Sequence, residues 1–387
     1  MLPSFDTLID APGWEVWTTH VEDNNVIFRL LEIEEKTVCP FCGSEHTNLH
    51  KKKVLKVRDL PMLGKNTILE LDRSQHCCKH CHKYFTRPSE KIDFLRSLTE
   101  RFKDHIMERL KNSTIECVAK EENLTPDQVR GILESRLRGK KPSRKARKIG
   151  IDEFSRRKGK GDYVTVVCNL DTGEILEIID SHQQDEIIKT LMGWSLEERE
   201  AITEVSVDMW GGFTKVIKTV FPNARIVYDR FHVMKILNEE LNKIRKECNP
   251  KLKKLKTKGI RRLILKNGES LTAEEKEVLE TILKCSKRLR NAYLLKEEFR
   301  QIYETHQAPE VAKERLEAWL AKASEIYSDI ITTVKNHLDG ICNYFYDRTT
   351  NGKMEGINNK IKVIKRQAYG FTNFEHLQMR IFLAFSH

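Results

Sequence analysis

The chain has 387 residues, a formal net charge of +11 and a pI near 9.0. This length exceeds the size at which single hydrophobic cores stop growing, so we expect at least two domains, and the basic charge favours a polyanionic partner, above all nucleic acid. The sequence contains no run of eighteen apolar residues and no basic segment followed by an apolar one at its start, which argues against membrane-spanning and secreted classes and predicts a cytoplasmic protein.

The first clear motif is a pair of C-x-x-C sequences, Cys39/Cys42 in CPFC and Cys78/Cys81 in CKHC. This arrangement is typical of a tetrahedral structural zinc site, and in a cytosolic chain it favours a metal over disulfides. The stretches KVLKVRDL and NTILELDRS predict two strands joined at LGKN, a hairpin that would close the long gap between the pairs. Two alternatives stay open: thiols without metal, including a redox pair, and a different ligand at one position. The residues that could replace a predicted ligand are Cys77, His46, His76, His80 and His82.

Two helices joined by a turn are predicted after the zinc motif. Ile115, Val118 and Ala119 share one helical face, ENL interrupts the pattern, and a second helix starts at TPDQ, with Thr125 as N-cap and Gln128 closing a capping box. Such a pair can place its second helix in the major groove of DNA, although an ordinary helical hairpin has the same pattern. The basic linker RLRGKKPSRKARK follows directly and favours DNA binding. The DNA contacts predicted here are Gln128, Arg130, Arg136, Arg138, Lys140, Lys141, Arg144, Lys145 and Arg147.

Strand and helix patterns alternate after the linker. KIGIDEF, DYVTVVCNL and EILEIID predict three strands of an antiparallel meander, followed by helix, strand (ITEVSVDMW), helix, strand (ARIVYD) and a long helix. This is the order of ribonuclease H-like domains, in which the first strand is central and the fourth lies beside it. Asp152 would then end the first strand and Asp208 the fourth, so both carboxylates should meet at one edge of a mixed five-stranded α/β sheet.

Two neighbouring carboxylates repel each other and require a cation. Oxygen ligands with room for water suit Mg²⁺ (or Mn²⁺), and a third carboxylate would complete a two-metal site. The charged, helical region from about 233 to 346, with a capping box at Thr272 and Glu275, interrupts the sheet domain. In the helix of NGKMEGINNKIKVIKR, Asn351 is the expected cap and Glu355 lies in the first turn. Its buried side is expected to carry Ile357, Ile361 and Ile364, and its exposed side Asn358, Asn359 and Lys362.

The motifs CPFC, CKHC, GIDEF, VSVDMW, DRFH and NGKMEGINNKIKVIKR together resemble the bacterial insertion-sequence transposases of the ISL-three family, over nearly the whole chain. The resemblance implies a zinc-binding domain, a helix-turn-helix and a ribonuclease H-like Asp-Asp-Glu domain interrupted by an all-α insertion. It implies that Asp152, Asp208 and Glu355 form the catalytic triad, with Asp229 and His232 in support. It also implies a dimer or larger assembly on DNA.

The expected function is DNA transposition in the bacterial cytoplasm, at the nucleoid. Mg²⁺ held by the triad would activate water to cut a strand at the terminal inverted repeats, and the freed 3′ hydroxyl would attack target DNA. Phosphate contacts near the cut are expected from the basic stretch KLKKLKTKGIRR and from three cations beside Glu355. These cations are Lys362, Lys365 and Arg366.

Two other functions have weaker support in the sequence. Another ribonuclease H-like metal nuclease seldom needs a separate zinc and helix-turn-helix region, and a transposase-derived DNA-binding regulator would not need all three acids. Each acid taken singly could be an ordinary strand-end, capping or first-turn residue. The domains expected are 1–92 (zinc-binding), 93–147 (helix-turn-helix and linker), 148–234 (catalytic, first part), 235–346 (α-helical insertion) and 347–387 (catalytic, C-terminal helices).

Overall fold

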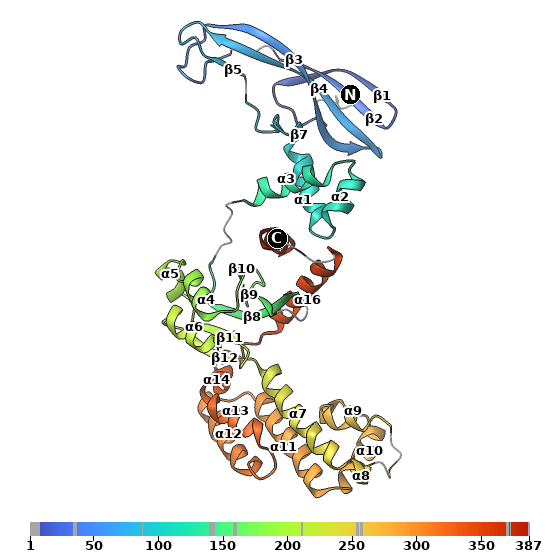
Figure 1. Cartoon of the computed structure of the whole chain (residues 1–387), viewed down its shortest axis with the longest axis vertical. Helices are drawn as coiled ribbons and strands as arrows, with labels where there is room; N and C mark the ends of the chain where they lie inside the picture. The colour runs from blue at the N-terminus through green and yellow to red at the C-terminus, as the bar shows by residue number, and fades with distance from the viewer. Residues whose placement is uncertain are drawn as a thin grey trace. The chain divides into compact units, whose positions relative to one another are not determined.

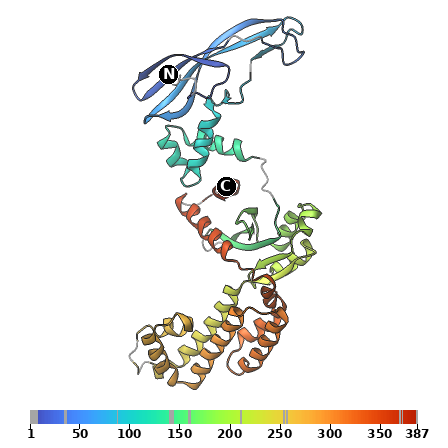
Figure 2. The same cartoon turned by 180° about the vertical axis from the view of Figure 1, so that it is seen from behind.

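The structure is a computed structural model of the chain, seen from two opposite sides in Figures 1 and 2. Its chain contacts divide into two compact units, Met1–Gly139 and Lys140–His387. No helix among the residues it describes is long and apolar enough to cross a membrane. Two predicted DNA contacts, Lys140 and Lys141, lie outside the described residues. The structure describes residues 8–33, 37–86, 88–138, 144–157, 161–209, 212–252, 255, 258–368, 371 and 373–385.

A seven-stranded sheet makes up most of the first unit, in the order β1-β2-β4-β3-β7-β6, with β5 paired to β4. The β3–β4 hairpin is its longest part, and its turn residues Leu63 and Gly64 both have positive φ, as a tight hairpin turn requires. The predicted hairpin is confirmed, and it is longer than predicted because pairing continues to Thr47↔Cys78. The strands are β1 (Trp14–Glu22), β2 (Asn25–Glu32), β3 (Thr47–Met62), β4 (Lys65–Cys78), β5 (Tyr84–Thr86), β6 (Ile92–Asp93) and β7 (Leu98–Thr99).

Three helices complete this unit: α1 (Glu100–Leu110), α2 (Ile115–Glu121) and α3 (Pro126–Leu137). The predicted helix, turn and helix are α2 and α3, and the capping box of Thr125 and Gln128 is present. No prediction covers α1, which Thr99 caps. Its Phe102 and Ile106 are fully buried, so the two predicted helices pack on a third one.

The second unit contains a five-stranded sheet in the order β10-β9-β8-β11-β12. The first three strands pair antiparallel, and β11 pairs parallel with both β8 and β12, so the predicted meander and the central first strand are confirmed. One prediction is wrong: Asp152 lies inside β8, which continues to Arg157 because it stays paired with β9. The strands are β8 (Lys148–Arg157), β9 (Asp162–Asn169), β10 (Ile175–Ile179), β11 (Glu204–Val207) and β12 (Arg225–Tyr228).

Helices cover both faces of this sheet (Figures 1 and 2). Ile149 and Ile151 of β8 pack with α4 (Gln184–Leu191) and α6 (Gly212–Val220), while Phe154 belongs to a second cluster with α16 (Gly352–Gln367) and α17 (Phe374–Phe385). This division follows from the alternation of side chains along a strand. Even-numbered residues of β8 therefore face α16. The short helix α5 (Leu196–Glu200) follows α4 in the chain.

A group of helices lies between β12 and α16 in the chain and gathers at the β12 end of the sheet (Figure 1). Its centre is aromatic, with Trp319 and Tyr303 fully buried. The capping box predicted at Thr272 and Glu275 is present at the start of α10. The elements are α7 (Arg230–Glu247), α8 (Asn249–Leu252), α9 (Ile260–Leu265), η3 (Gly268–Ser270), α10 (Ala273–Lys284), α11 (Lys287–Glu304), α12 (Pro309–Ala323), α13 (Asp329–Asn336), α14 (Leu338–Cys342) and α15 (Tyr344–Asp347).

Candidate active site and candidate metal centre

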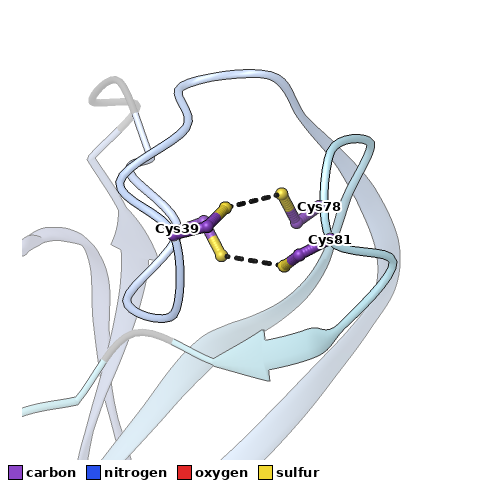
Figure 3. A group of neighbouring side chains, drawn as sticks. Cys39, Cys78 and Cys81 are labelled. Carbon is purple, nitrogen blue, oxygen red and sulfur yellow. Dashed lines mark hydrogen bonds between the residues drawn. The ribbon is translucent and has the colours of Figure 1, made fainter.

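Four cysteines meet at the open end of the β3–β4 hairpin. Figure 3 shows Cys39 opposite Cys78 and Cys81, which come from the end of β4 and the turn after it. The sulfur atoms of Cys39 and Cys81 are 3.6 Å apart, as are those of Cys42 and Cys78, and all four lie within 4.8 Å of one another. A tetrahedral zinc ion with Zn–S bonds of about 2.3 Å places its sulfur ligands about 3.8 Å apart. The cluster therefore fits a structural zinc ion.

Backbone groups favour the thiolate form of one of these cysteines, Cys78. The N–H groups of Cys81 and His80 lower the pKa of the Cys78 thiol to about 6, and the His80 N–H donates to its sulfur at 3.4 Å. A thiolate is the form that binds metal. Cys77, which could have replaced Cys78, precedes it on β4, and its sulfur lies 3.9 Å from the Cys78 carbonyl oxygen, outside the cluster. Among the described residues, the group that could hold a metal ion is thus made of the two C-x-x-C pairs.

Asp152 lies on β8, and Asp208 comes directly after the neighbouring parallel strand β11. Gly150 of β8 is paired with Ser206 of β11, and each aspartate comes two residues later in the chain. Asp208 follows the last residue of β11, and its Oδ1 accepts a hydrogen bond from the Met209 N–H at 2.5 Å. Burial and the nearby charge of Asp208 raise the pKa of Asp152. The side-by-side placement predicted for these two carboxylates is thus present, with Asp152 inside its strand.

Helix α16 crosses the face of the sheet next to Asp152. A Cβ added to Gly150 would lie 2.9 Å from Asn351 Oδ1, so glycine at this position allows the helix to begin directly over β8. Glu355, exposed in the first turn of α16, lines the same cavity as Asp152. The predicted buried isoleucines of this helix are buried. Two details differ from prediction: Asn351 occupies the N-cap position without a side-chain capping bond, and Asn358 is buried.

Asn358 connects α16 to the first carboxylate. Its Nδ2 donates a hydrogen bond of 2.7 Å to Asp152 Oδ2, and its side chain is on the face of the sheet that α16 covers. The helical spacing alone places Asn358 one turn after Glu355, which explains the expectation of exposure. Only the tertiary contact with β8 shows that this amide is buried at the carboxylate.

Asp229 and His232 extend the group of polar residues. Asp229 is 6% exposed and precedes α7, and its Oδ2 lies 3.1 Å from His232 Nδ1. The other ring nitrogen, Nε2, lies 3.7 Å from Asp208 Oδ2. The hydrogen bond that His232 makes to Asp229, followed by the charges of Asp208, Asp229 and Asp152, raises the pKa of His232. The histidine thus bridges a buried acid and one of the two sheet-edge carboxylates.

The carboxylates do not form a closed cage in this arrangement. Among the described residues, the four-cysteine cluster is the only group of three or more His, Cys, Asp or Glu side chains with ligand atoms all within 4.8 Å. Asp152 and Glu355 face a cavity of about 450 Å³, so water and a substrate have room beside them. Such an open, oxygen-only group can take part in metal chemistry and leaves positions for other ligands.

The side chains predicted to contact DNA in the first unit differ in their exposure and in their ion pairs. Arg136 is held by α1, since its Nη2 lies 2.6 Å from Asp104 and 2.9 Å from Glu100. Arg130 pairs with Asp127 at 2.5 Å, and Gln128 is exposed while its Oε1 accepts from the Thr125 N–H. Arg138 is exposed. Arg136 therefore fastens α3 to α1, whereas the first turn of α3 is exposed.

The predicted contacts of the second unit also fall into two groups. Lys145, Arg147, Lys362 and Arg366 are exposed. Arg144 pairs with Glu177 at 2.7 Å and lies over the Trp194 ring, and Lys365 donates to the Ser155 carbonyl oxygen. The first group is free to meet phosphates, whereas Arg144 and Lys365 hold parts of the fold together.

Comparison with known proteins gives two family matches. The model of a transposase family, the DDE transposases of the ISL3 type, matches residues 149–381. A zinc-finger model from the transposases IS204, IS1001, IS1096 and IS1165 matches residues 35–81, which contain the four cysteines. The two matches cover the sheet of the second unit and the zinc cluster of the first.

Three curated proteins share stretches of this sequence. The transposase for insertion sequence element IS1001 of Bordetella parapertussis is 27% identical over 361 residues, which cover 90% of this chain and 88% of that protein. The transposase for IS1557 of Mycobacterium tuberculosis is 27% identical over 255 residues, 58% of this chain and 57% of that protein. A Lactococcus lactis protein described as an ATP-dependent protease is 35% identical over 118 residues, 30% of this chain and 37% of that protein.

Proposed function

We propose, for a chain that belongs to the ISL3-type family of DDE transposases, that Asp152, Asp208 and Glu355 hold the divalent metal with which it cuts and transfers DNA strands. One observation carries the assignment. Asp152 on β8 lies beside Asp208, which directly follows the parallel strand β11, and Glu355 of the covering helix lines the same cavity as Asp152. The substrate proposed is the pair of terminal inverted repeats of the insertion sequence, followed by a target DNA.

The side chains at this edge of the sheet fit a hard divalent cation. Their donor atoms are carboxylate oxygens, and burial together with the charge of Asp208 raises the pKa of Asp152, a cost that a bound cation would offset. Mg²⁺ or Mn²⁺ held by Asp152, Asp208 and Glu355 would supply Lewis acidity for the attacking and leaving oxygens. No covalent bond between protein and DNA is required.

The remaining polar residues position these carboxylates. The Asn358 amide donates a hydrogen bond to Oδ2 of Asp152, and the Glu153 N–H donates one to Oδ1 at 2.7 Å. Both oxygens of this carboxylate are therefore oriented by hydrogen bonds. Asp229 fixes the ring of His232 through Nδ1, so that Nε2 points toward Asp208. Loss of Asp229 or His232 would therefore weaken cleavage without abolishing it. Lys362, exposed on the cavity wall, is placed to meet a phosphate.

The architecture proposed for the catalytic part is ribonuclease H-like. The strand order β10-β9-β8-β11-β12, with β8 central, supports this assignment, and the helices from α7 to α15 would be an all-α insertion before the helix that carries Glu355. The domain limits proposed are the five ranges derived from the sequence. The first unit includes α1–α3 together with the zinc-bearing sheet.

Recognition of the DNA ends is proposed for the first unit and the linker after it. The exposed Gln128 and the partly exposed Arg130 of α3 would meet the DNA, as would Arg138, which directly follows this helix. Lys145 and Arg147 would meet phosphates. Paired ends require at least two copies of the protein, so a dimer or larger assembly on DNA is part of the proposal. Action on DNA in the bacterial cytoplasm follows from the same function.

Replacing Lys145 and Arg147 together by Ala should reduce the salt dependence of DNA binding. Each phosphate contact contributes a slope of about −0.9 to the plot of log affinity against log salt concentration, so the slope should become shallower by about two. The measurement is the affinity of the full chain for a duplex at several salt concentrations. Lys276 and Lys284, exposed on α10, serve as the matched control pair. An unchanged slope in the Lys145/Arg147 variant would remove the linker from the DNA interface.

Replacing Asn358 by Ala should raise the Mg²⁺ concentration needed for half-maximal cleavage. The variant lacks the hydrogen bond that orients Asp152, and loss of such an outer partner typically costs about 10- to 100-fold in metal affinity or activity. High Mg²⁺ should restore much of the rate, which a merely unfolded variant would not show. Asn359→Ala, at the exposed neighbouring position, should behave like wild type. Wild-type Mg²⁺ dependence in Asn358→Ala would refute the positioning role.

The DNA on either side of the coding region tests the proposed function most simply. Terminal inverted repeats there, bound and cut by the purified protein, are the result expected of an insertion-sequence transposase. Cleavage without preference for those repeats would indicate another metal nuclease. Binding to the repeats without any cleavage would indicate a regulator.

A further inference from the structure

A cavity of about 450 Å³ opens beside the carboxylates, between the start of α7 and the start of α16. Part of its wall belongs to the proposed active site, including Asp152 and Glu355. The rest of the wall comes mainly from α7, together with Asn267, which precedes η3, and Arg300 of α11. The residues of this second part that matter below are Arg230, Phe231, Asn238, Asn267 and Arg300.

Three asparagines that line the cavity have a buried side-chain oxygen without a hydrogen-bond partner among the described residues. They are Asn238, Asn351 and Asn358. Buried polar atoms nearly always have a partner in native proteins. These amides therefore keep unused acceptor capacity next to the cavity.

The arginines of this wall are already neutralised. Arg230 pairs with Glu304, and Arg300, whose side chain is 6% exposed, lies 3.0 Å from Glu269 and 3.1 Å from Glu297. A phosphate would compete with these carboxylates for the guanidinium groups. The inner wall thus favours a neutral polar group over an anion.

Phe231 supplies an aromatic surface to the same cavity. This residue lies between Arg230 and His232 in the first turn of α7. Its side chain is 59% exposed, although most of the other residues that line the cavity are polar. Its ring meets His232 edge to face, with 5.5 Å between the centroids. An exposed aromatic ring beside a nucleic-acid site is a platform on which an unpaired base stacks.

We propose that the cavity receives a single unpaired nucleobase next to the phosphate that is cut. A pocket of several hundred Å³ accepts a ligand of nucleotide size, whereas a duplex is far too wide to enter. The base would stack on Phe231, and the amides of Asn238 and Asn267 would meet its edge, since amides and base edges have complementary donors and acceptors. This inference depends on the proposed function in one respect, namely that the phosphate to be cut lies at the carboxylates.

The test measures binding of two short duplexes that differ only in a central bulge, which is a single 2-aminopurine nucleotide in one and a single abasic residue in the other. The full-length protein, without added Mg²⁺, should bind the base-containing bulge roughly 5- to 100-fold more tightly, as expected for one base stacked on an aromatic ring. Contacts of the first unit are the same for both probes and cancel in this ratio. Phe231→Ala should bind both probes equally, and Phe231→Trp should keep the preference.

The control is Tyr346→Ala, which removes a ring that is 50% exposed and outside the cavity wall, and which should retain the wild-type preference. Equal binding of the two probes by the wild type would overturn the proposal, as would a Phe231→Ala variant that weakens both by the same factor. The assay requires no cleavage. Its failure therefore leaves the metal assignment standing, and failure of the metal assignment leaves this result unaffected.

Discussion

Asp152→Asn, Asp208→Asn and Glu355→Gln are each expected to lower strand cleavage by about 10³-fold or more, because a metal ion contributes several kcal/mol to the transition state. The substitutions keep the shape of the side chain and remove its charge, so folding and binding of the DNA ends should stay close to wild type. Because the three residues act as one unit, a double variant should be hardly worse than a single one. The measurement is the rate of nicking at the terminal repeats in Mg²⁺.

Glu153→Gln is the matched control for this series. Glu153 is the next residue on β8 and points to the opposite face from Asp152, and its Oε1 is buried without a hydrogen-bond partner among the described residues. Burial raises the pKa of this carboxyl, so its ionised form is penalised at neutral pH. Neutralising it should keep cleavage and leave stability equal or higher at neutral pH. Loss of cleavage in Glu153→Gln with retention in Asp152→Asn would show that the assignment is one residue out of register.

Cys42→Ser is expected to reduce the zinc content from about one ion per chain to almost none and to unfold the zinc-bearing part of the first unit. Structural zinc in small domains binds with about 10–16 kcal/mol at neutral pH, and that free energy is folding free energy. The second unit is separately compact and should keep its thermal transition. Metal analysis and thermal denaturation of the purified protein measure both effects.

Cys77→Ser provides the control for the zinc site. Its sulfur lies outside the four-cysteine cluster, although it is adjacent to Cys78 in the sequence. The variant should retain zinc and the wild-type transition. Absence of zinc from wild-type protein purified without chelator would contradict the site, and so would loss of zinc in Cys77→Ser alone.

Much of the fold was predictable because local patterns and tertiary contacts agree. The capping box of Thr125 and Gln128 marks the start of α3, and the turn at Leu63 and Gly64 joins two strands of alternating pattern. The expected strand order, with the first strand central and the fourth beside it, predicted that Asp152 and Asp208 meet at one edge of the sheet. Helix α1 was visible in the sequence too, since Thr99 precedes an amphipathic stretch, but no prediction covers it.

Other features depend on contacts that a sequence pattern does not contain. Asp152 was expected at a strand end because polarity begins there, but pairing with β9 carries β8 on to Arg157. Asn358 was expected on the exposed side of its helix, and only the approach of α16 to Gly150 buries it against Asp152. The cavity beside it joins segments far apart in the chain, so spacing along the sequence could not indicate it.

The most direct test of the metal assignment is cleavage of the terminal repeats by Asp208→Cys in Mg²⁺ and in Mn²⁺. A thiolate is a poor ligand for the hard Mg²⁺ ion and a better one for softer divalent ions, so a true ligand position should respond to the choice of metal. The account predicts that Asp208→Cys is inactive in Mg²⁺ and recovers strand cleavage in Mn²⁺, while Asp208→Asn stays inactive in both. Substantial cleavage by Asp208→Asn in Mg²⁺ would contradict it.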